Sequence, residues 1–102
     1  MDSEQVKHIS RTKIFNVIAP HVKIVKKKCF SEWYSIRYAY FPLLETVEEN
    51  GFYECASLYQ VVGNCLKQIG ESGFDSCYCL AKINLENVES FGKFSFYNGS
   101  LQ

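Results

Sequence analysis

The chain has 102 residues with a formal net charge of zero, and it is 47% hydrophobic and 16% aromatic. This composition is too apolar for a disordered chain, and the length suits one domain. The sequence contains no apolar run of 18 residues and no apolar segment of the signal-peptide type near its start, so it predicts neither a bilayer span nor a secretory leader. We therefore expect a single small globular domain over 1–102, with 1–10 frayed.

The charged residues are distributed unevenly along the chain. Eight of the eleven Lys and Arg residues lie between Lys7 and Arg37, whereas eight of the eleven acidic residues lie from Glu45 onward. We interpret this asymmetry as two oppositely charged faces of one domain that attract each other.

The first 50 residues give weak secondary-structure signals. Residues 12–25 are apolar but broken by Pro20, which favours a short helix or strand up to Ile18 and then an extended piece over 21–25. The aromatic segment 30–41 fits a helical face and an alternating strand equally well, so the pattern leaves both open. Pro42 ends that element.

The segment 52–69 gives the strongest pattern. Apolar side chains recur there in steps of three and four residues, at Phe52, Cys55, Tyr59, Val62, Leu66 and Ile69. This spacing is typical of an amphipathic helix, and we expect that helix to be the centre of the core. Short strands are predicted near 74–83 and 93–97. The predicted fold class is therefore α+β, mainly helical, and we identify no internal repeat.

The five cysteines do not form a recognisable site. We interpret Cys29, Cys55, Cys65, Cys77 and Cys79 as reduced thiols in a cytosolic compartment. Cys77 and Cys79 resemble half of a zinc site, but a second ligand pair is missing. His8-Ile9-Ser10 matches half of a paired phosphodiesterase signature and is more simply a surface histidine. We predict no catalytic residue, no metal and no cofactor, and hence no enzyme.

The only dense basic patch precedes the aromatic segment. It consists of Lys23, Lys26, Lys27 and Lys28. With Phe30, Trp33 and Tyr34 it could bind a nucleic-acid strand, the lysines neutralising phosphates and the aromatic rings stacking on bases. Two other readings stay open: a solvated charge run, and attraction to an anionic membrane surface. Asn98-Gly99-Ser100 also matches a glycosylation acceptor, which is unused in the cytosol.

Several short motifs, taken in order, resemble the C-terminal domain of coronavirus non-structural protein 4. They are Arg37-Tyr38-Ala39-Tyr40-Phe41, Tyr53-Glu54-Cys55-Ala56, the segment from Ser72 to Tyr78, and the terminal Leu101-Gln102. The run after Tyr78 is longer than the family's and has no proline. The resemblance therefore implies a divergent, torovirus-like nidovirus member.

This resemblance implies a function. The chain would be the cytosolic tail of a viral replicase membrane protein that helps form replication organelles. It would act as a non-enzymatic interaction domain on the cytosolic face of host intracellular membranes. Its partners would be other replicase proteins, the membrane surface and possible RNA. The viral main protease would cut after Gln102, with Leu101 in its adjacent pocket. The alternative function is a small nucleic-acid-binding accessory module that uses the basic patch.

Overall fold

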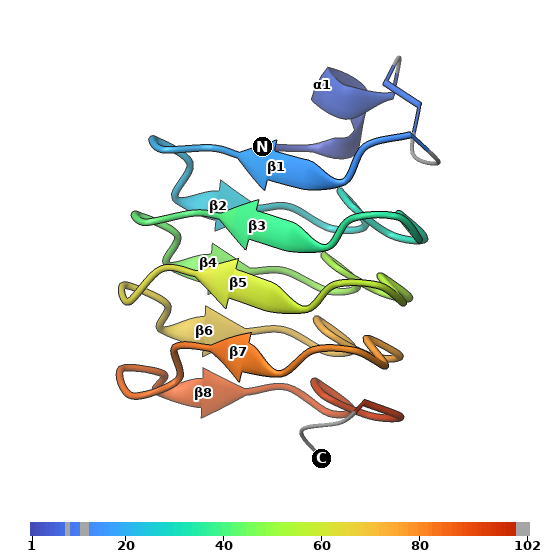
Figure 1. The fold of residues 1–102 in the computed structure, drawn as a ribbon. Coiled ribbons are helices and arrows are strands. Elements are labelled where there is room, and N and C mark those ends of the chain that lie inside the picture. Colours follow the sequence, from blue (N-terminus) through green and yellow to red (C-terminus); the bar gives the residue numbers. More distant parts are fainter. Residues whose placement is uncertain (8, 11–12, 100–102) are drawn as a thin grey trace.

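The computed structural model describes residues 1–7, 9–10 and 13–99, and the chain winds there as a parallel β-solenoid (Figure 1). One short helix precedes eight short strands. Their bounds are α1 Ser3–Val6, β1 Asn16–Ile18, β2 Ile24–Val25, β3 Tyr38–Tyr40, β4 Thr46–Val47, β5 Gln60–Val62, β6 Gln68–Ile69, β7 Lys82–Ile83 and β8 Ser90–Phe91. The predicted mainly helical α+β fold is therefore wrong.

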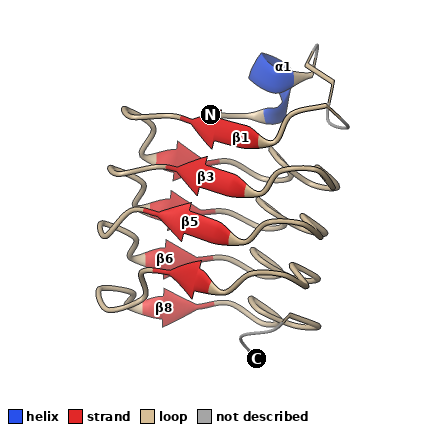
Figure 2. Ribbon diagram, viewed as in Figure 1, coloured by secondary structure: helices blue, strands red, loops and turns tan. Residues whose placement is uncertain are grey.

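Each turn of the solenoid, here called a coil, gives one strand to each of two sheets. The strand orders are β1-β3-β5-β7 and β2-β4-β6-β8, and every pair is parallel (Figure 2). The register is constant, because Asn16 pairs with Tyr38 and Tyr38 pairs with Gln60, each 22 positions further along the chain. The structure is thus a stack of 22-residue coils, each covered by the next.

The same 22-residue interval runs through the core, so the interpretation that the chain lacks an internal repeat is wrong. Phe30, Phe52, Phe74 and Phe96 occupy one position in successive coils. Their rings stack with centroids 5.3, 5.1 and 5.4 Å apart. Phe30, Phe52 and Phe74 are at most 1% exposed. This phenylalanine ladder fixes one corner of every coil, since large aromatic side chains contribute most to core packing.

The predicted central helix over 52–69 is absent, and the segment instead contains β5 and β6. Consecutive tight turns, and not helical winding, produce its three-residue apolar spacing. Cys55 N–H donates to the Phe52 carbonyl, and Leu58 N–H donates to the Cys55 carbonyl. All three side chains point into the core. Glu54 between them has a left-handed φ of 55°, which a right-handed helix cannot contain.

The other predicted elements need similar corrections. The strand expected over 74–83 is reduced to β7, and 93–97 forms turns instead of a strand. Phe94 has a φ of 59° and is 57% exposed. In 30–41, the two alternatives left open resolve into turns followed by β3. The segment ending at Ile18 is a strand.

The helix α1 covers the N-terminal end of the stack (Figure 1). Asp2 forms a capping box with Gln5, and Val6 is buried against the core. The terminal ammonium of Met1 donates to the Ile24 carbonyl at 2.7 Å, and Lys26 N–H donates to the Met1 carbonyl at 2.9 Å. Within the described ranges, no helix is long and apolar enough to cross a bilayer.

Gly63 allows one coil to pass close to the coil above. A Cβ atom added there would collide with the Phe41 carbonyl oxygen, and the glycine φ is 157°. Backbone atoms cannot move aside as a flexible side chain can. We therefore expect Gly63→Ala to lower the free energy of unfolding by about 2 kcal/mol or more, measured by urea denaturation. Ala56→Gly is the reverse change in the same coil; a loss as large in that variant would contradict the steric explanation.

Candidate protein-interaction face

The outer side of the β1-β3-β5-β7 sheet exposes an aromatic and aliphatic surface. Ala39 and Val61, at the strand centres, are at most 3% exposed and face the core. Because side chains alternate along a strand, their neighbours face outward. We define the tyrosine face as the outward residues Ile18, Tyr38, Tyr40 and Val62, together with Phe15 and Tyr59, two exposed residues that directly precede β1 and β5. It spans three successive coils and contains residues up to 47 positions apart in the chain.

Two cations lie against the aromatic rings of this face. The Arg37 guanidinium lies 5.4 Å from the Phe15 ring centroid, and the Lys82 ammonium lies 5.8 Å from that of Tyr59. Such contacts hold the charged groups over the rings. The strand residues and their immediate N-terminal neighbours include no acidic side chain, so the tyrosine face carries a positive charge.

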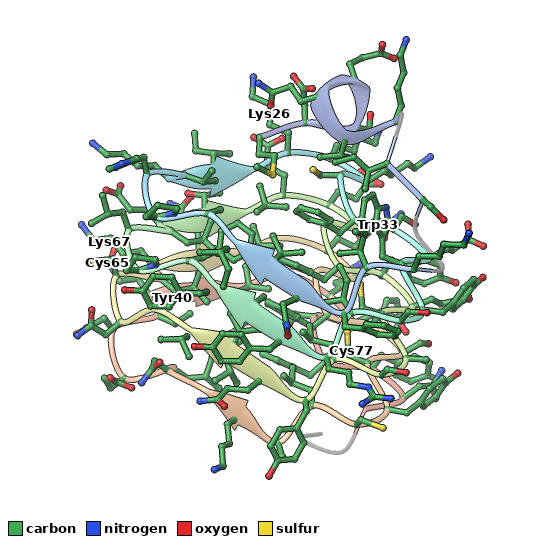
Figure 3. The ribbon with its side chains drawn as sticks, turned by 45° about the horizontal axis from the view of Figure 1, so that its top comes forward. Lys26, Trp33, Tyr40, Cys65, Lys67 and Cys77 are labelled. Carbon is green, nitrogen blue, oxygen red and sulfur yellow. The ribbon has the colours of Figure 1, made fainter. Side chains whose placement is uncertain are left out.

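A hollow of about 270 Å³ adjoins Tyr40 at the end of the strands. Its lining is Tyr40, Pro42, Val62, Gly63, Asn64 and Asn84. It lies beside Gly63, the position at which no side chain fits. Tyr40 itself lies on the outer side of β3 in Figure 3. The hollow extends the tyrosine face with a recess that has both amide and apolar walls.

The outer side of the second sheet is different in chemistry. Its outward positions are Ile24, Thr46, Gln68 and Ser90. Only Ile24 among them is a large apolar residue, at 39% exposed. The aromatic side chains are therefore concentrated on one of two sheets that share the same core and the same coil geometry.

All four side chains of the predicted basic patch are exposed on the first coil, but acidic residues of the second coil lie beside them. The Lys27 ammonium is 3.6 Å from a Glu49 carboxylate oxygen. Lys27 N–H also donates to the Glu48 carboxylate at 3.2 Å. The Glu45 N–H donates to the Lys23 carbonyl, and Lys26 lies beside α1 (Figure 3). The basic segment thus lies on the first coil, and the acidic segment lies on the coil stacked next to it.

The aromatic residues predicted to stack on nucleic-acid bases are not available to do so. Phe30 is 1% and Trp33 is 5% exposed. Tyr34 is exposed, but its hydroxyl donates to the Glu32 carboxylate at 2.8 Å. That hydrogen bond, together with partial desolvation and the Glu32 and Glu54 charges, raises the pKa of Tyr34 to about 12. Two carboxylates beside this ring repel phosphate, so the nucleic-acid alternative is unsupported.

The cysteines are free thiols, and most of them are inside the stack. Cys29, Cys55 and Cys77 are buried, Cys65 is half-buried and Cys79 is exposed. Cys77 and Cys79 therefore do not lie on the same side of the chain, as they would in a regular strand. Burial raises the pKa of Cys29 to about 12 and raises that of Cys55 well above its usual value. Among the described residues, no group of three potential ligands could hold a metal ion.

Some predicted site residues lie outside the described residues. These are the expected cleavage residues Leu101 and Gln102, and also His8 and Ser100. Residues of the tyrosine face, by contrast, were missed as a site. The sequence does contain a signal for this face, namely the 22-residue interval of the phenylalanine ladder. The same interval separates Phe15, Arg37 and Tyr59 and so places them at one position of successive coils.

The fold and the exposed sheet define a solenoid repeat protein, in which short coils stack and one sheet surface displays variable side chains. The chain belongs to the BspA type leucine rich repeat family, whose model matches residues 7–102 with six copies. The described residues form four strands in each sheet, and each coil contributes one strand to each sheet. The six copies of the family model therefore do not correspond one to one to coils. No curated protein and no solved structure gives a significant match.

This family assignment overturns the resemblance to coronavirus non-structural protein 4. The motifs that carried the resemblance fall at unrelated places in the coil. Tyr38-Ala39-Tyr40 is β3, whereas Tyr53 to Ala56 and Ser72 to Tyr78 are turns and loop. The predicted role as a viral replicase tail is therefore wrong, and so is the implied viral context.

Proposed function

We propose that this chain is a non-enzymatic interaction module that binds a protein partner through the tyrosine face. Leucine-rich repeats generally mediate protein–protein interaction. The observation that carries the proposal is the contrast between the two outer sheet surfaces. Both cover the same core, yet one displays Tyr38, Tyr40, Tyr59 and Phe15 while the other is mainly polar.

Tyrosine is well suited to such a surface. Its ring contributes large contact area with few rotatable bonds, and its hydroxyl forms hydrogen bonds, so tyrosine is enriched among residues that dominate binding energy. The strands pair in constant register, so equivalent positions of successive coils lie next to one another along the stack. A folded partner surface or an extended segment can therefore contact several coils at once.

The charges of the face indicate the partner's chemistry. Arg37 and Lys82 lie over its rings and no acidic residue is among its strands. A partner segment with apolar or aromatic side chains beside carboxylates would complement it. The partners inferred from the viral resemblance, namely replicase proteins, a host membrane, RNA and a main protease, lose their support with that resemblance.

The proposed absence of catalysis is supported by the state of the thiols. A thiolate is the reactive form of cysteine, and burial keeps Cys29 and Cys55 protonated at neutral pH. The free thiols also support a reducing compartment as the site of action. Alkylation and mass spectrometry of the chain taken from its source cell test this second proposal: disulfides at Cys65 or Cys79 would contradict it.

Site-specific photo-crosslinking tests the proposed binding face. We expect a photoreactive amino acid at Tyr40 to capture a discrete partner, whereas the same group at Gln68 on the second sheet captures none. With the purified partner, Tyr40→Ala is expected to weaken binding by about tenfold or more, measured by calorimetry. Gln68→Ala is the matched control, because it truncates an exposed strand side chain of the other sheet.

Two results would overturn the proposal. One is efficient capture at Gln68 but not at Tyr40. The other is an equal effect of Tyr40→Ala and Gln68→Ala on the Kd. Thermal unfolding of both variants separates these outcomes from a general loss of fold, since neither side chain lies in the core.

A further inference from the structure

The hollow beside Tyr40 lies at the end of the strands on the outer side of the β1-β3-β5-β7 sheet (Figure 3). We call it the Tyr40 hollow, and its lining is Tyr40, Pro42, Val62, Gly63, Asn64 and Asn84. Tyr40 pairs with Val62, and Asn84 follows Ile83, the partner of Val61. Tyr40, Val62 and Asn84 thus form one outward column across three coils. A coil added at either end of the stack would extend this column and would not cover the hollow.

The Tyr40 hollow exists because a short side chain separates two longer ones. Tyr40 and Asn84 are two coils apart, which is about 9–10 Å at the usual spacing of paired strands. Val62 between them is short, and Gly63 beside it has no side chain. The resulting volume of about 270 Å³ is just below the roughly 300–1,000 Å³ of pockets for drug-sized ligands. The hollow therefore suits a ligand with a single six-membered ring.

Two side-chain amides in the Tyr40 hollow have hydrogen-bonding capacity to spare. The Asn84 Oδ1 atom accepts a hydrogen bond from the Gly63 N–H at 3.3 Å, which fixes the orientation of this amide. Its Nδ2 group has no acceptor among the residues that the structure describes. Asn64 is exposed, and its Oδ1 atom has only a weak contact from the Cys65 thiol at 3.9 Å. Both amides can therefore still bond to a ligand.

The chemistry of the walls selects among possible ligands. None of the described residues that line the Tyr40 hollow is charged, so a phosphate, a carboxylate or a cation would find no opposite charge there. Amides both donate and accept hydrogen bonds, as sugar hydroxyl groups do. The face of the Tyr40 ring carries partial negative charge, which attracts the C–H groups on one side of a pyranose ring. An aromatic ring beside two amides thus matches a neutral sugar.

From these observations we infer that the Tyr40 hollow binds one ring of a neutral sugar. The pyranose stacks on the Tyr40 ring, and its hydroxyl groups form hydrogen bonds with the Asn64 and Asn84 amides. A β-glucose unit has its substituents near the plane of the ring, which leaves a C–H face free to stack. Because the ligand is small and the hollow is open to solvent, we expect a Kd on the order of millimolar. This site goes beyond the proposed protein-binding function and needs no protein partner.

Titration of the isotope-labelled 102-residue chain with methyl β-D-glucopyranoside, followed by amide NMR spectra, tests the inference. Sugar concentrations up to roughly 100 mM bracket a millimolar Kd. The expected result is a saturable shift of the Gly63 backbone amide and of the Asn64 and Asn84 side-chain amides. Sorbitol is the matched control ligand, because it carries similar hydroxyl groups but has no ring face, and it should cause no saturable shift.

Substitutions separate the roles of the ring and the amides. Asn84→Ala removes one hydrogen-bonding group and is expected to weaken sugar binding by about fivefold or more. Asn16→Ala is the matched control, because Asn16 is an exposed asparagine on β1 of the same sheet. Tyr40→Phe keeps the stacking ring and should leave the Kd within about twofold, whereas Tyr40→Ala should abolish measurable binding. If circular dichroism shows that Asn84→Ala does not fold, Asn64→Ala repeats the comparison with Asn16→Ala.

Three results would overturn the sugar site: no saturable shift at the highest sugar concentration, equal shifts with sorbitol, or an equal loss of affinity in Asn16→Ala and Asn84→Ala. None of them bears on the proposed protein partner, because photo-crosslinking at Tyr40 decides that proposal separately. A partner captured at Tyr40 without any sugar binding would mean that the Tyr40 hollow is part of the protein interface alone. Sugar binding without a captured partner would support the sugar site and contradict the protein-binding proposal.

Discussion

Phe52→Ala should be among the most destabilising single substitutions in this protein, lowering the free energy of unfolding by about 3–5 kcal/mol. Phe52 is fully buried, and its ring stacks between Phe30 and Phe74 at 5.3 and 5.1 Å. It also meets the Phe41 ring edge-on at 5.9 Å. Removing it leaves a cavity in the middle of the ladder, where the coils on both sides are held by their own backbone hydrogen bonds and cannot collapse.

Urea denaturation and thermal unfolding measure this effect. For a domain of this size, a loss of that magnitude lowers the Tm by about 12 °C or more. Phe94→Ala is the control, because Phe94 is 57% exposed and contacts Tyr97 at the surface; it should cost about 1 kcal/mol or less. Similar losses of unfolding free energy in the two variants would mean that the phenylalanine ladder does not contribute most of the stability of the core.

The sequence located much of the core although it misassigned the fold. Phe52, Cys55, Leu66 and Ile69, assigned to the apolar stripe of a helix, are all at most 2% exposed. Tyr59, assigned to the same stripe, is 48% exposed. A three-residue step occurs both in a helix and in consecutive turns that each point one side chain inward. Within one coil, the two arrangements give nearly the same apolar pattern.

The missing information was periodicity over a longer distance. Left-handed residues recur at Lys28, Asn50, Ser72 and Phe94, with φ between 55° and 60°. Only Asn among these residue types favours that conformation, so three of the four positions give no turn signal. The coils form because neighbours impose the same backbone geometry on one another, which residue-by-residue propensity cannot predict.

The candidate site was hidden for the same reason. Tyr38 and Tyr40 were visible as members of an alternating segment, but Phe15 and Tyr59 lie 19 to 25 residues away on either side. Strand pairing with a 22-residue register places them side by side. A surface built across coils cannot be recognised before the repeat is recognised. A local motif such as the basic patch is visible in the sequence at once, although the structure does not support it as a nucleic-acid site.

Removing one complete coil should leave a folded protein, and this is the second large effect that the repeat predicts. Deletion of residues 37–58 joins Ile36 to Tyr59, which are at successive positions of the coil. Phe30 then lies above Phe74, and the strands β1 and β5 take the pairing that each made with β3. Stability in such stacks is approximately a sum over coils and their contacts, so the shortened chain should unfold cooperatively but at a lower temperature.

Deletion of half a coil should have the opposite result. Without residues 37–47, a strand position is placed over a turn position where the part before the deletion meets the part after it, and the phenylalanine ladder is broken between Phe30 and Phe52. The coils on each side keep their own spacing but lose their hydrogen bonds and core contacts across this junction, which leaves fewer than three stacked coils in either part, too few for a stable repeat stack. Far-UV circular dichroism and urea unfolding should therefore show a folded chain after the 22-residue deletion and an unfolded chain after the 11-residue deletion. A folded 11-residue deletion variant would contradict the constant register on which the tyrosine face depends.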